Sequence, residues 1–397
     1  MTFVIVTPRD PLIARDGRSF GAGQNMYSLD WILPSVFAGS LRTFLGKQNQ
    51  TTFDEKLIDI LHNTGFRGPF PFYNNEIYFP KPADYIVKED ENDNEKGTVY
   101  SARPLKELTD DDGMNLPVGL MPAMLPKDVD EDFKPKKTPA FWSWKKMNRW
   151  LQQEVVVSEG ELYDEGDTLQ LPEKDERIHV AIDPESGASE DSKLFSTTGL
   201  DFNFKDKNNE SQQLQIIAEI SEYQDPKSRA DKEHVKKILR KLDELDALYP
   251  LGGERRLAHW RTVSRNGIFP AASDWLRSVK EGDKIRMALV TPARFNNGWR
   301  PGWYNCKKDL RTIPNTDVQV ELKGAIVERW LPISGWSYQN NTPKATRRLA
   351  PAGSVYFFEV VKGGDLSKAW LQSVGDREGE DGLGLALFGK WNYHSQS

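Results

Sequence analysis

The chain has 397 residues, of which 38% are hydrophobic and 28% are charged, and its 12 Trp and 19 Phe exclude a globally disordered protein. This length exceeds one ordinary core and predicts two or three domains. The formal net charge of −6 excludes a nonspecific coat of nucleic acid, which would be basic, although an acidic body can still carry a local basic surface that binds RNA.

The first predicted elements are strands and amphipathic helices. Residues 2–7 alternate and are rich in β-branched side chains, which predicts a strand. Pro34 suits a first helical position, and the apolar spacing after it predicts a helix to about Lys47. The following stretches predict a short strand or hairpin at 68–82, loops at 84–97 and 126–139, a helix at 139–153, a strand at 214–221, an amphipathic helix at 231–248, and a strand that ends near 264. Residues 84–210 are interpreted as insertions into a smaller core.

A second series of elements follows, with strands predicted at 284–292, 325–331, 354–361 and 383–391 and a short helix at 365–374. The second series repeats the later part of the first. The order strand, helix, strand, strand, helix, strand is that of a ferredoxin-like unit, whose open sheet face is a common platform for RNA. We therefore predict an α+β fold of two tandem ferredoxin-like, RRM-like modules. The first spans 1–270, with insertions and a projecting hairpin, and the second spans 271–397, with a glycine-rich loop.

Two segments near the first helix are candidates for binding phosphate. Arg15 and Arg18 lie beside Gly21 and Gly23, and guanidinium groups bind phosphate oxygens where glycine lets backbone approach. The same composition suits a solvated surface loop. In the helix, Gly39 costs roughly 1 kcal/mol relative to Ala, so either close approach of another backbone or helix–sheet packing should offset it.

Further candidates are three short segments later in the chain. Paired glycines precede Arg255 and Arg256, which suits either a phosphate-binding turn or a salt-bridged one. Lys344, Arg347 and Arg348 form the most basic short stretch, directly before a predicted strand. Glycines 379–389 open a strand and not a helix, which excludes a dinucleotide or P-loop motif. The predicted hairpin carries His179, which could contact RNA or have a purely structural role.

Patterns of catalytic or metal-binding residues are lacking in the sequence. The five His have no metal-ligand spacing, and there is no HExxH, CxxC or Gly-x-Ser-x-Gly motif. The lone cysteine, Cys306, permits no internal disulfide and no multi-cysteine zinc site. We therefore expect no catalytic residue, no metal and no cofactor. The absence of a signal-peptide pattern and of a long apolar run predicts a cytoplasmic protein that does not bind membranes.

The order of these motifs resembles the third subunit of the type III-B (Cmr) CRISPR effector, a RAMP protein of the Cas-five-like group. The resemblance covers nearly the whole chain and is carried by DPLIARDGRSFGAG, LPSVFAGSLR, GPFPF, HVAIDPESGASEDSKLFST, PLGGERRLAHW, RRLAPAGSVYFF and GLGLALFGKW. It implies a non-catalytic antiviral subunit that holds the 5′ tag of the CRISPR RNA. Its implied partners are the large polymerase/cyclase-type subunit and the target-cleaving backbone RAMP subunit, with target RNA contacted indirectly.

The resemblance also implies roles for individual residues. Phosphate contacts with the tag are implied for Arg15, Arg18, Ser40, Arg42, Arg255, Arg256, Lys344, Arg347 and Arg348, and close backbone approach for Gly39, Gly382 and Gly384. Arg177, His179 and Phe195 are placed on the projecting hairpin, near RNA or a neighbouring subunit. Two alternatives remain open. One is a RAMP-type endoribonuclease that processes CRISPR repeats, with His62 as its candidate base, and the other is the equivalent subunit of another type III subtype.

Overall fold

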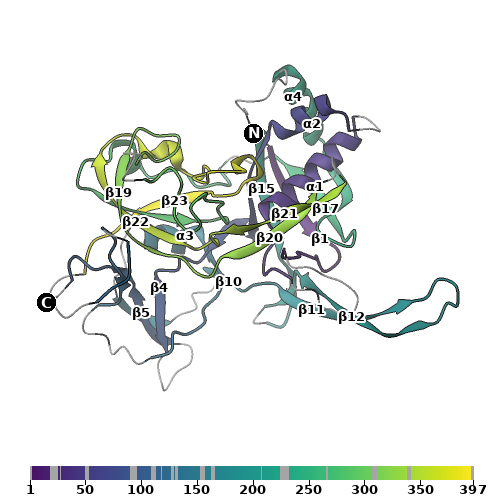
Figure 1. Cartoon of the computed structure of the whole chain (residues 1–397), viewed down its shortest axis with the longest axis horizontal. Helices are drawn as coiled ribbons and strands as arrows, with labels where there is room; N and C mark the ends of the chain where they lie inside the picture. Colours follow the sequence, from purple (N-terminus) through teal and green to yellow (C-terminus); the bar gives the residue numbers. More distant parts are fainter. Residues whose placement is uncertain are drawn as a thin grey trace.

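A computed structural model of the chain describes residues 2–17, 26, 28–49, 53–89, 96–108, 113–117, 119–126, 129, 133–152, 157–161, 166–206, 208–223, 232–264, 267–305, 311–337 and 341–394. It is a mixed α/β structure whose sheets are mostly antiparallel and whose described helices are few (Figure 1). None of the described helices is long and apolar enough to cross a membrane.

An eight-stranded sheet contains the N-terminal part of the chain. Its centre has the order β2-β15-β1-β17, in which every neighbouring pair is antiparallel. The strands of this centre are β1 (Thr2–Pro8), β2 (Thr64–Tyr73), β15 (Gln215–Glu222) and β17 (Leu257–Val263). The outer strands are β3 (Glu76–Pro80), β8 (Phe141–Ser143), β10 (Thr168–Leu169) and β16 (Asp246–Pro250).

Three helices cover one face of this sheet: α1 (Pro34–Lys47), α2 (Glu55–His62) and α4 (Lys232–Leu239). The bounds of α1 are those predicted, with Pro34 at its start. Helix α2 was not predicted, although its N-cap Asp54 accepts a hydrogen bond from the Leu57 amide at 2.7 Å. The helix predicted over 231–248 is wrong at its end. It gives way to a 3₁₀ turn (Arg240–Leu242), and β16 then pairs with β17.

Both faces of the eight-stranded sheet are buried, which corrects the expectation of an open face. Along β1, Val4 and Val6 belong to the core under the helices, whereas Ile5 belongs to a second core shared with the C-terminal part. Phe70 of β2 and Met287 of the C-terminal sheet lie in that shared core too. The face that could have been an RNA platform is therefore covered by the chain itself.

The C-terminal sheet has the order β19-β22-β18-β23, again with antiparallel neighbours. Its strands are β18 (Lys284–Leu289), β19 (Gln319–Ile326), β22 (Val355–Lys362) and β23 (Ala386–Lys390), and a 3₁₀ helix, η4 (Leu366–Ala369), replaces the predicted α-helix. The strand predicted at 325–331 is misplaced, because β19 ends at Ile326. A hairpin of β20 (Leu331–Ser337) and β21 (Thr342–Leu349) follows β19 and precedes β22 along the chain.

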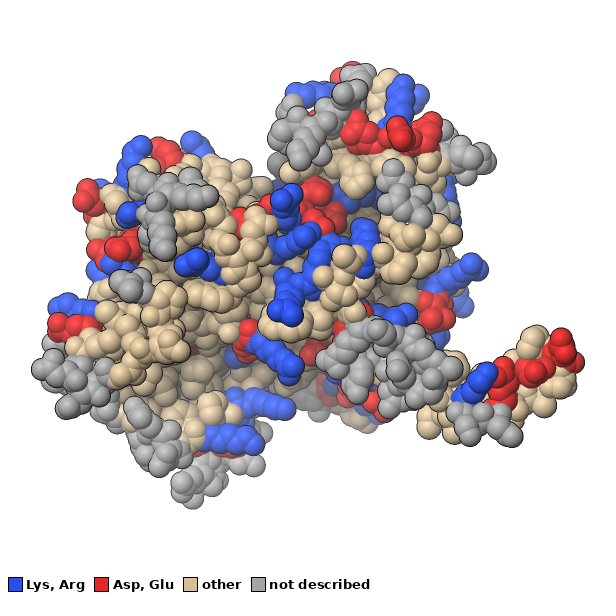
Figure 2. Space-filling model, viewed as in Figure 1, with Lys and Arg blue, Asp and Glu red and all other residues tan. Residues whose placement is uncertain are grey.

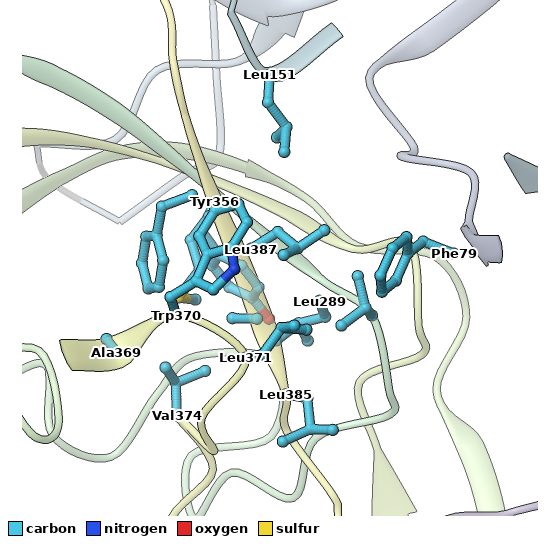
Figure 3. Packing of buried hydrophobic residues seen from close by; sticks show 14 of the residues in the cluster. Phe79, Leu151, Leu289, Tyr356, Ala369, Trp370, Leu371, Val374, Leu385 and Leu387 are labelled. Atoms are coloured by element: carbon cyan, nitrogen blue, oxygen red, sulfur yellow. The ribbon is translucent and has the colours of Figure 1, made fainter. Parts of the chain in front are cut away.

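Part of the insertion after residue 84 is a folded unit. The stretch predicted as a loop at 84–97 contains β4 (Tyr85–Glu89) and the start of β5 (Lys96–Ser101), which pair with each other and with β9 (Val157–Glu161). Residues 141–143 of the predicted helix form β8, and α3 follows as Trp144–Leu151. A two-stranded ladder joins β6 (Arg103–Pro104) to β7 (Ala123–Met124). Figure 3 shows Phe79 and Leu151 around Leu289, Tyr356 and Leu387 of the C-terminal sheet.

A long hairpin, which we call the arm, extends away from the body of the molecule (Figure 1). It consists of β11 (Glu173–Ile182) and β12 (Ser189–Asp201), and a small hairpin of β13 (Asn203–Lys205) and β14 (Ser211–Gln213) follows it. The arm is anchored at its base, where Leu12 and Leu200 exchange backbone hydrogen bonds of 2.9 and 2.7 Å. Along the chain, the arm occurs after β2 and before β15, although these two strands are neighbours in the sheet.

Candidate nucleic-acid interface

The loop before α1 packs on the β20–β21 hairpin. The Gly17 amide donates to the carbonyl of Pro332 at 2.9 Å, and the Thr346 hydroxyl donates to the carbonyl of Gly17 at 3.4 Å. A Cβ on Gly17 would lie 2.7 Å from the Ile333 backbone, so this approach requires glycine. Arg15, two residues earlier, is exposed. The loop therefore presents Arg15 next to the basic hairpin, and the predicted partner Arg18 lies outside the described residues.

The turn with the paired glycines lies against the same loop. The Gly253 amide donates to the carbonyl of Ile13 at 2.8 Å, and a Cβ on Gly252 would lie 2.5 Å from that oxygen. Glu254 and Arg255 both have left-handed backbone, with φ of 55° and 52°. Arg255 is exposed, while Arg256 is partly buried and its Nε is buried with no hydrogen-bond partner among the described residues.

Helix α1 joins this turn to the glycine-rich loop. The Ser40 hydroxyl donates to the carbonyl of Pro250, and Arg42 forms an ion pair with Asp381. The guanidinium of Arg42 also donates to the carbonyl of Thr64 at 2.7 Å. Ser40 and Arg42 thus have partners within the chain, and their predicted contact with RNA stays a prediction. Gly39, by contrast, is exposed, and a Cβ there would meet nothing within 4 Å.

Gly382 and Gly384 are buried and approach the chain's own backbone. Both have left-handed φ, of 91° and 78°. A Cβ on Gly382 would lie 2.7 Å from the Gly68 carbonyl oxygen, and one on Gly384 would lie 2.7 Å from the Gly375 nitrogen. This packing accounts for both glycines without a ligand. Their predicted approach to RNA is not tested by these contacts.

The three cations of the basic stretch belong to strand β21, not to a loop that precedes a strand. Arg347 forms an ion pair with Glu378, which also binds Arg294 at 3.2 Å. Arg348 is exposed and its guanidinium carbon lies 4.5 Å from the ring centroid of Trp330. Lys344 is exposed as well. Figure 2 shows Lys and Arg side chains gathered in the middle of this face, over the hairpin.

The residues predicted on the arm lie apart from these loops. His179 stacks on Phe195 across the two strands, with ring centroids 5.2 Å apart, and its Nε2 lies 2.8 Å from the Thr197 hydroxyl. Arg177 is exposed and donates to Asp175 at 2.7 Å. Sequence reasoning missed the aliphatic side chains of the arm, although β11 alternates. They are Ile178, Leu194, Ile182 and Val180, which are 79%, 62%, 55% and 40% exposed.

A groove of about 1160 Å³ lies between β2, β15 and α4 on one side and the loop 372–380 on the other. Its lining mixes cations, such as Arg67 and Arg240, with acids such as Glu222 and Glu380. Burial raises the pKa of the Glu380 carboxyl above its ordinary value. This charge balance favours the hairpin surface over the groove as the place where a polyanion binds.

Within the described residues, no group of three or more His, Cys, Asp or Glu side chains is placed to hold a metal ion. Cys306 lies outside them. His62, the candidate base of the endoribonuclease alternative, is the last residue of α2 and is exposed.

Comparison with known proteins places the chain in a family. Residues 4–391 match the family described as CRISPR-associated protein (Cas_Cmr3). No curated protein sequence matches the chain. A chain of the type III-B Cmr-β complex bound to cognate target RNA and AMPPnP is 17% identical, with 89% of this chain and 86% of that one covered and a TM-score of 0.43.

Two further solved structures are similar. A chain of the Cmr-β complex bound to cognate target RNA alone is 16% identical over the same shares, with a TM-score of 0.43. A chain of the Csm3–Csm4 subcomplex of the type III-A interference complex is 14% identical, with 99% of this chain and 100% of that one covered and a TM-score of 0.41. The family assignment does not rest on these likenesses but on the match over nearly the whole sequence. The chain belongs to the Cmr3 family of CRISPR-associated proteins, the third subunits of type III-B effectors.

Proposed function

We propose that this chain is a non-catalytic, RNA-holding subunit of a type III-B CRISPR effector, and that it binds the 5′ tag of the CRISPR RNA. In the proposed assembly it contacts the large polymerase/cyclase-type subunit and the target-cleaving backbone subunit, and target RNA indirectly. The observation that carries the proposal is the convergence of three segments on one surface. The Arg15 loop packs on the β20–β21 hairpin, and the Arg255 turn packs on that loop.

The fold proposed for this role is a pair of ferredoxin-like modules. In each sheet the second, third, first and fourth strands of the unit lie side by side, as β2-β15-β1-β17 and as β19-β22-β18-β23. This is the strand order of a βαββαβ unit with four antiparallel strands. In the second module the described residues contain η4 at the position of the second helix.

The cations divide into two groups by their exposure. Arg347 pairs with Glu378, directly before the 3₁₀ turn that precedes Gly382, and Arg42 pairs with Asp381, the last residue of that turn. Both pairs hold the glycine-rich loop in place. Exposed cations are the candidates for binding RNA phosphates, which accept hydrogen bonds from guanidinium and ammonium groups. They are Arg15, Arg177, Arg255, Lys344 and Arg348, of which Arg177 also donates to Asp175. In this proposal the arm reaches RNA or a neighbouring subunit with His179 and Phe195.

The test uses the complete complex, reconstituted with CRISPR RNA. Replacing Lys344 and Arg348 together by Gln should weaken RNA retention and lower the dependence of log K on log salt by about 0.7 for each lost phosphate contact. The matched control replaces two exposed lysines of α4, Lys232 and Lys237, by Gln. Equal retention in the two double variants would mean that the hairpin surface faces protein or solvent.

The non-catalytic part of the proposal has a separate test. The purified chain is incubated with repeat RNA in the absence of metal ions. No specific cleavage is expected. Specific cleavage that disappears in His62→Ala would overturn this part and favour the endoribonuclease alternative.

A further inference from the structure

The β20–β21 hairpin exposes two tryptophans that the functional prediction did not use. Trp330, directly before β20, is 42% exposed, and Trp336 near the end of β20 is 57% exposed. Trp142, Trp260 and Trp391, by contrast, are buried, at 1% exposure each. Large exposed aromatic rings side by side with cations are a common feature of binding surfaces.

The hairpin has an anchored face and a free face. Ile333 and Leu349 are fully buried and pack with Leu33 and Leu383, so this face fixes the hairpin on the body. Pro332 and Arg348 are paired across the hairpin, and each is adjacent in sequence to a buried residue, Ile333 or Leu349. Because side chains alternate between the two faces of a strand, Arg348 lies on the face opposite the buried one. There its guanidinium lies over the Trp330 ring.

The electrostatics of this segment differ from those of the rest of the chain. No Asp or Glu occurs from Arg329 to Phe358, although the overall frequency of 59 acidic residues in 397 would give about four in a stretch of this length. Within the described residues, neither Lys344 nor Arg348 has an acidic partner. Lys344 pairs with Gly335 and so lies on the face opposite Trp336, whereas Arg348 shares the free face with the indole rings. The free face therefore combines the positive charge of Arg348 with exposed indole rings.

We infer that the free face of the hairpin is a base-stacking platform for single-stranded RNA. Trp330 and Trp336 stack on bases, while Arg348 binds a phosphate between them. Positive charge that follows the backbone and aromatic rings that stack on bases are the two components by which proteins hold single strands. The inference rests on the proposed function and deepens it, because it assigns base contacts to residues that no motif indicated.

The experiment measures binding of the full-length chain to a fluorescein-labelled oligouridylate of about twelve nucleotides. Trp330→Ala and Trp336→Ala should each raise Kd about fivefold or more, which corresponds to the lower end of the stacking energy per base. Trp336→Phe, which keeps a ring, should retain most of the affinity. The control Trp299→Ala removes an indole that is 38% exposed and lies outside the hairpin, and should leave Kd unchanged.

An abasic oligonucleotide of the same length separates stacking from charge. It should bind wild type and Trp336→Ala equally, whereas Arg348→Gln should weaken its binding. If wild type binds the base-containing RNA and both Ala variants bind it equally well, the stacking inference is wrong and the proposed function stands. If wild type binds no RNA, both fail. If the Ala variants keep RNA affinity but no longer enter the complex, the platform is a protein-docking surface and the inference is overturned.

Discussion

Asp84 and Arg286 form a buried ion pair that joins the insertion to the C-terminal sheet. Their Oδ2 and Nη1 atoms are 2.6 Å apart, and the side chains are 0% and 3% exposed. The Trp150 indole donates to the other carboxylate oxygen at 2.9 Å, and Arg286 lies over its ring. The guanidinium of Arg286, in the middle of strand β18, thereby fixes the insertion to the core.

Replacing Asp84 by Ala should destabilise the chain by about 3–5 kcal/mol, because the Arg286 guanidinium would remain buried without its counter-ion. The free energy of unfolding from urea titration measures this. The control removes one partner of an exposed ion pair on α4, with Glu233→Ala, and should cost at most about 1 kcal/mol. A cost for Asp84→Ala as small as that of the control would show that the pair does not support the fold.

The phenol of Tyr78 should make stability depend on alkaline pH. Burial, aided by Glu76 and Asp167, raises the pKa of Tyr78 from 10.0 to about 12. Its hydroxyl donates to the Gly166 carbonyl at 2.7 Å. Since the folded-state pKa is the higher one, this contribution is complete below pH 10 and is lost as the pH rises through 12.

Tyr78→Phe should therefore cost about 1 kcal/mol near neutral pH, and the difference from wild type should shrink between pH 10 and 12. Denaturant titrations across this range, with Tyr223→Phe as an exposed control, provide the measurement. A difference that stays constant up to pH 12 would contradict the assignment.

Two glycines should respond to alanine with opposite signs. Gly39→Ala adds a Cβ that meets nothing within 4 Å inside α1, so it should stabilise the isolated chain by up to about 1 kcal/mol. Gly382→Ala puts a Cβ 2.7 Å from the Gly68 carbonyl oxygen at a φ of 91°, and should destabilise it by at least about 1–3 kcal/mol. Thermal unfolding of both variants tests this, and the same sign for both would refute the packing argument.

If Gly39 is a point of close approach in the complex, its stabilising substitution should still reduce RNA retention. That combination distinguishes a binding role from a structural one. Unchanged retention in Gly39→Ala would remove Gly39 from the proposed interface.

The arm should matter for assembly and not for folding. Ile178→Ser with Leu194→Ser alters side chains that are 79% and 62% exposed, so the free energy of unfolding should change by less than about 0.5 kcal/mol per site. Co-purification with the other subunits and RNA should fall sharply, because the aliphatic face of the arm has no cover within the described chain. Glu176→Gln, on the same strand, is the control. Normal co-purification of the double variant would show that this face stays in solvent.

The sequence predicted elements well where the pattern is local. Helix α1 begins at Pro34 and follows an unbroken apolar period, and its bounds are as expected. Strand β16 was missed because Asp246–Pro250 follows a run of helix-forming residues and becomes a strand through its pairing with β17. Strand β4 was missed because charges dominate the stretch that contains it, although Tyr85 and Val87 are buried.

The candidate interface was predictable as separate loops and not as one surface. Arg15, Arg255 and Arg348 are far apart in sequence, and only the packing of Gly17 on Pro332 and of Gly253 on Ile13 shows that they converge. The intramolecular partner of Arg347 could not be foreseen either, because Glu378 lies in a loop beyond β22. The face of the eight-stranded sheet that the helices do not cover is buried by the C-terminal part of the chain. A contact between such distant segments cannot be predicted from a local sequence pattern.

Both sheets receive an extra hairpin at the same topological point. The arm and its neighbours enter between β2 and β15, and the β20–β21 hairpin enters between β19 and β22. A loop between the second and third strands can lengthen without disturbing the pairing of the strands that flank it. The length of each inserted hairpin and the side chains that it exposes can therefore change during evolution while the two sheets and their common core stay unchanged.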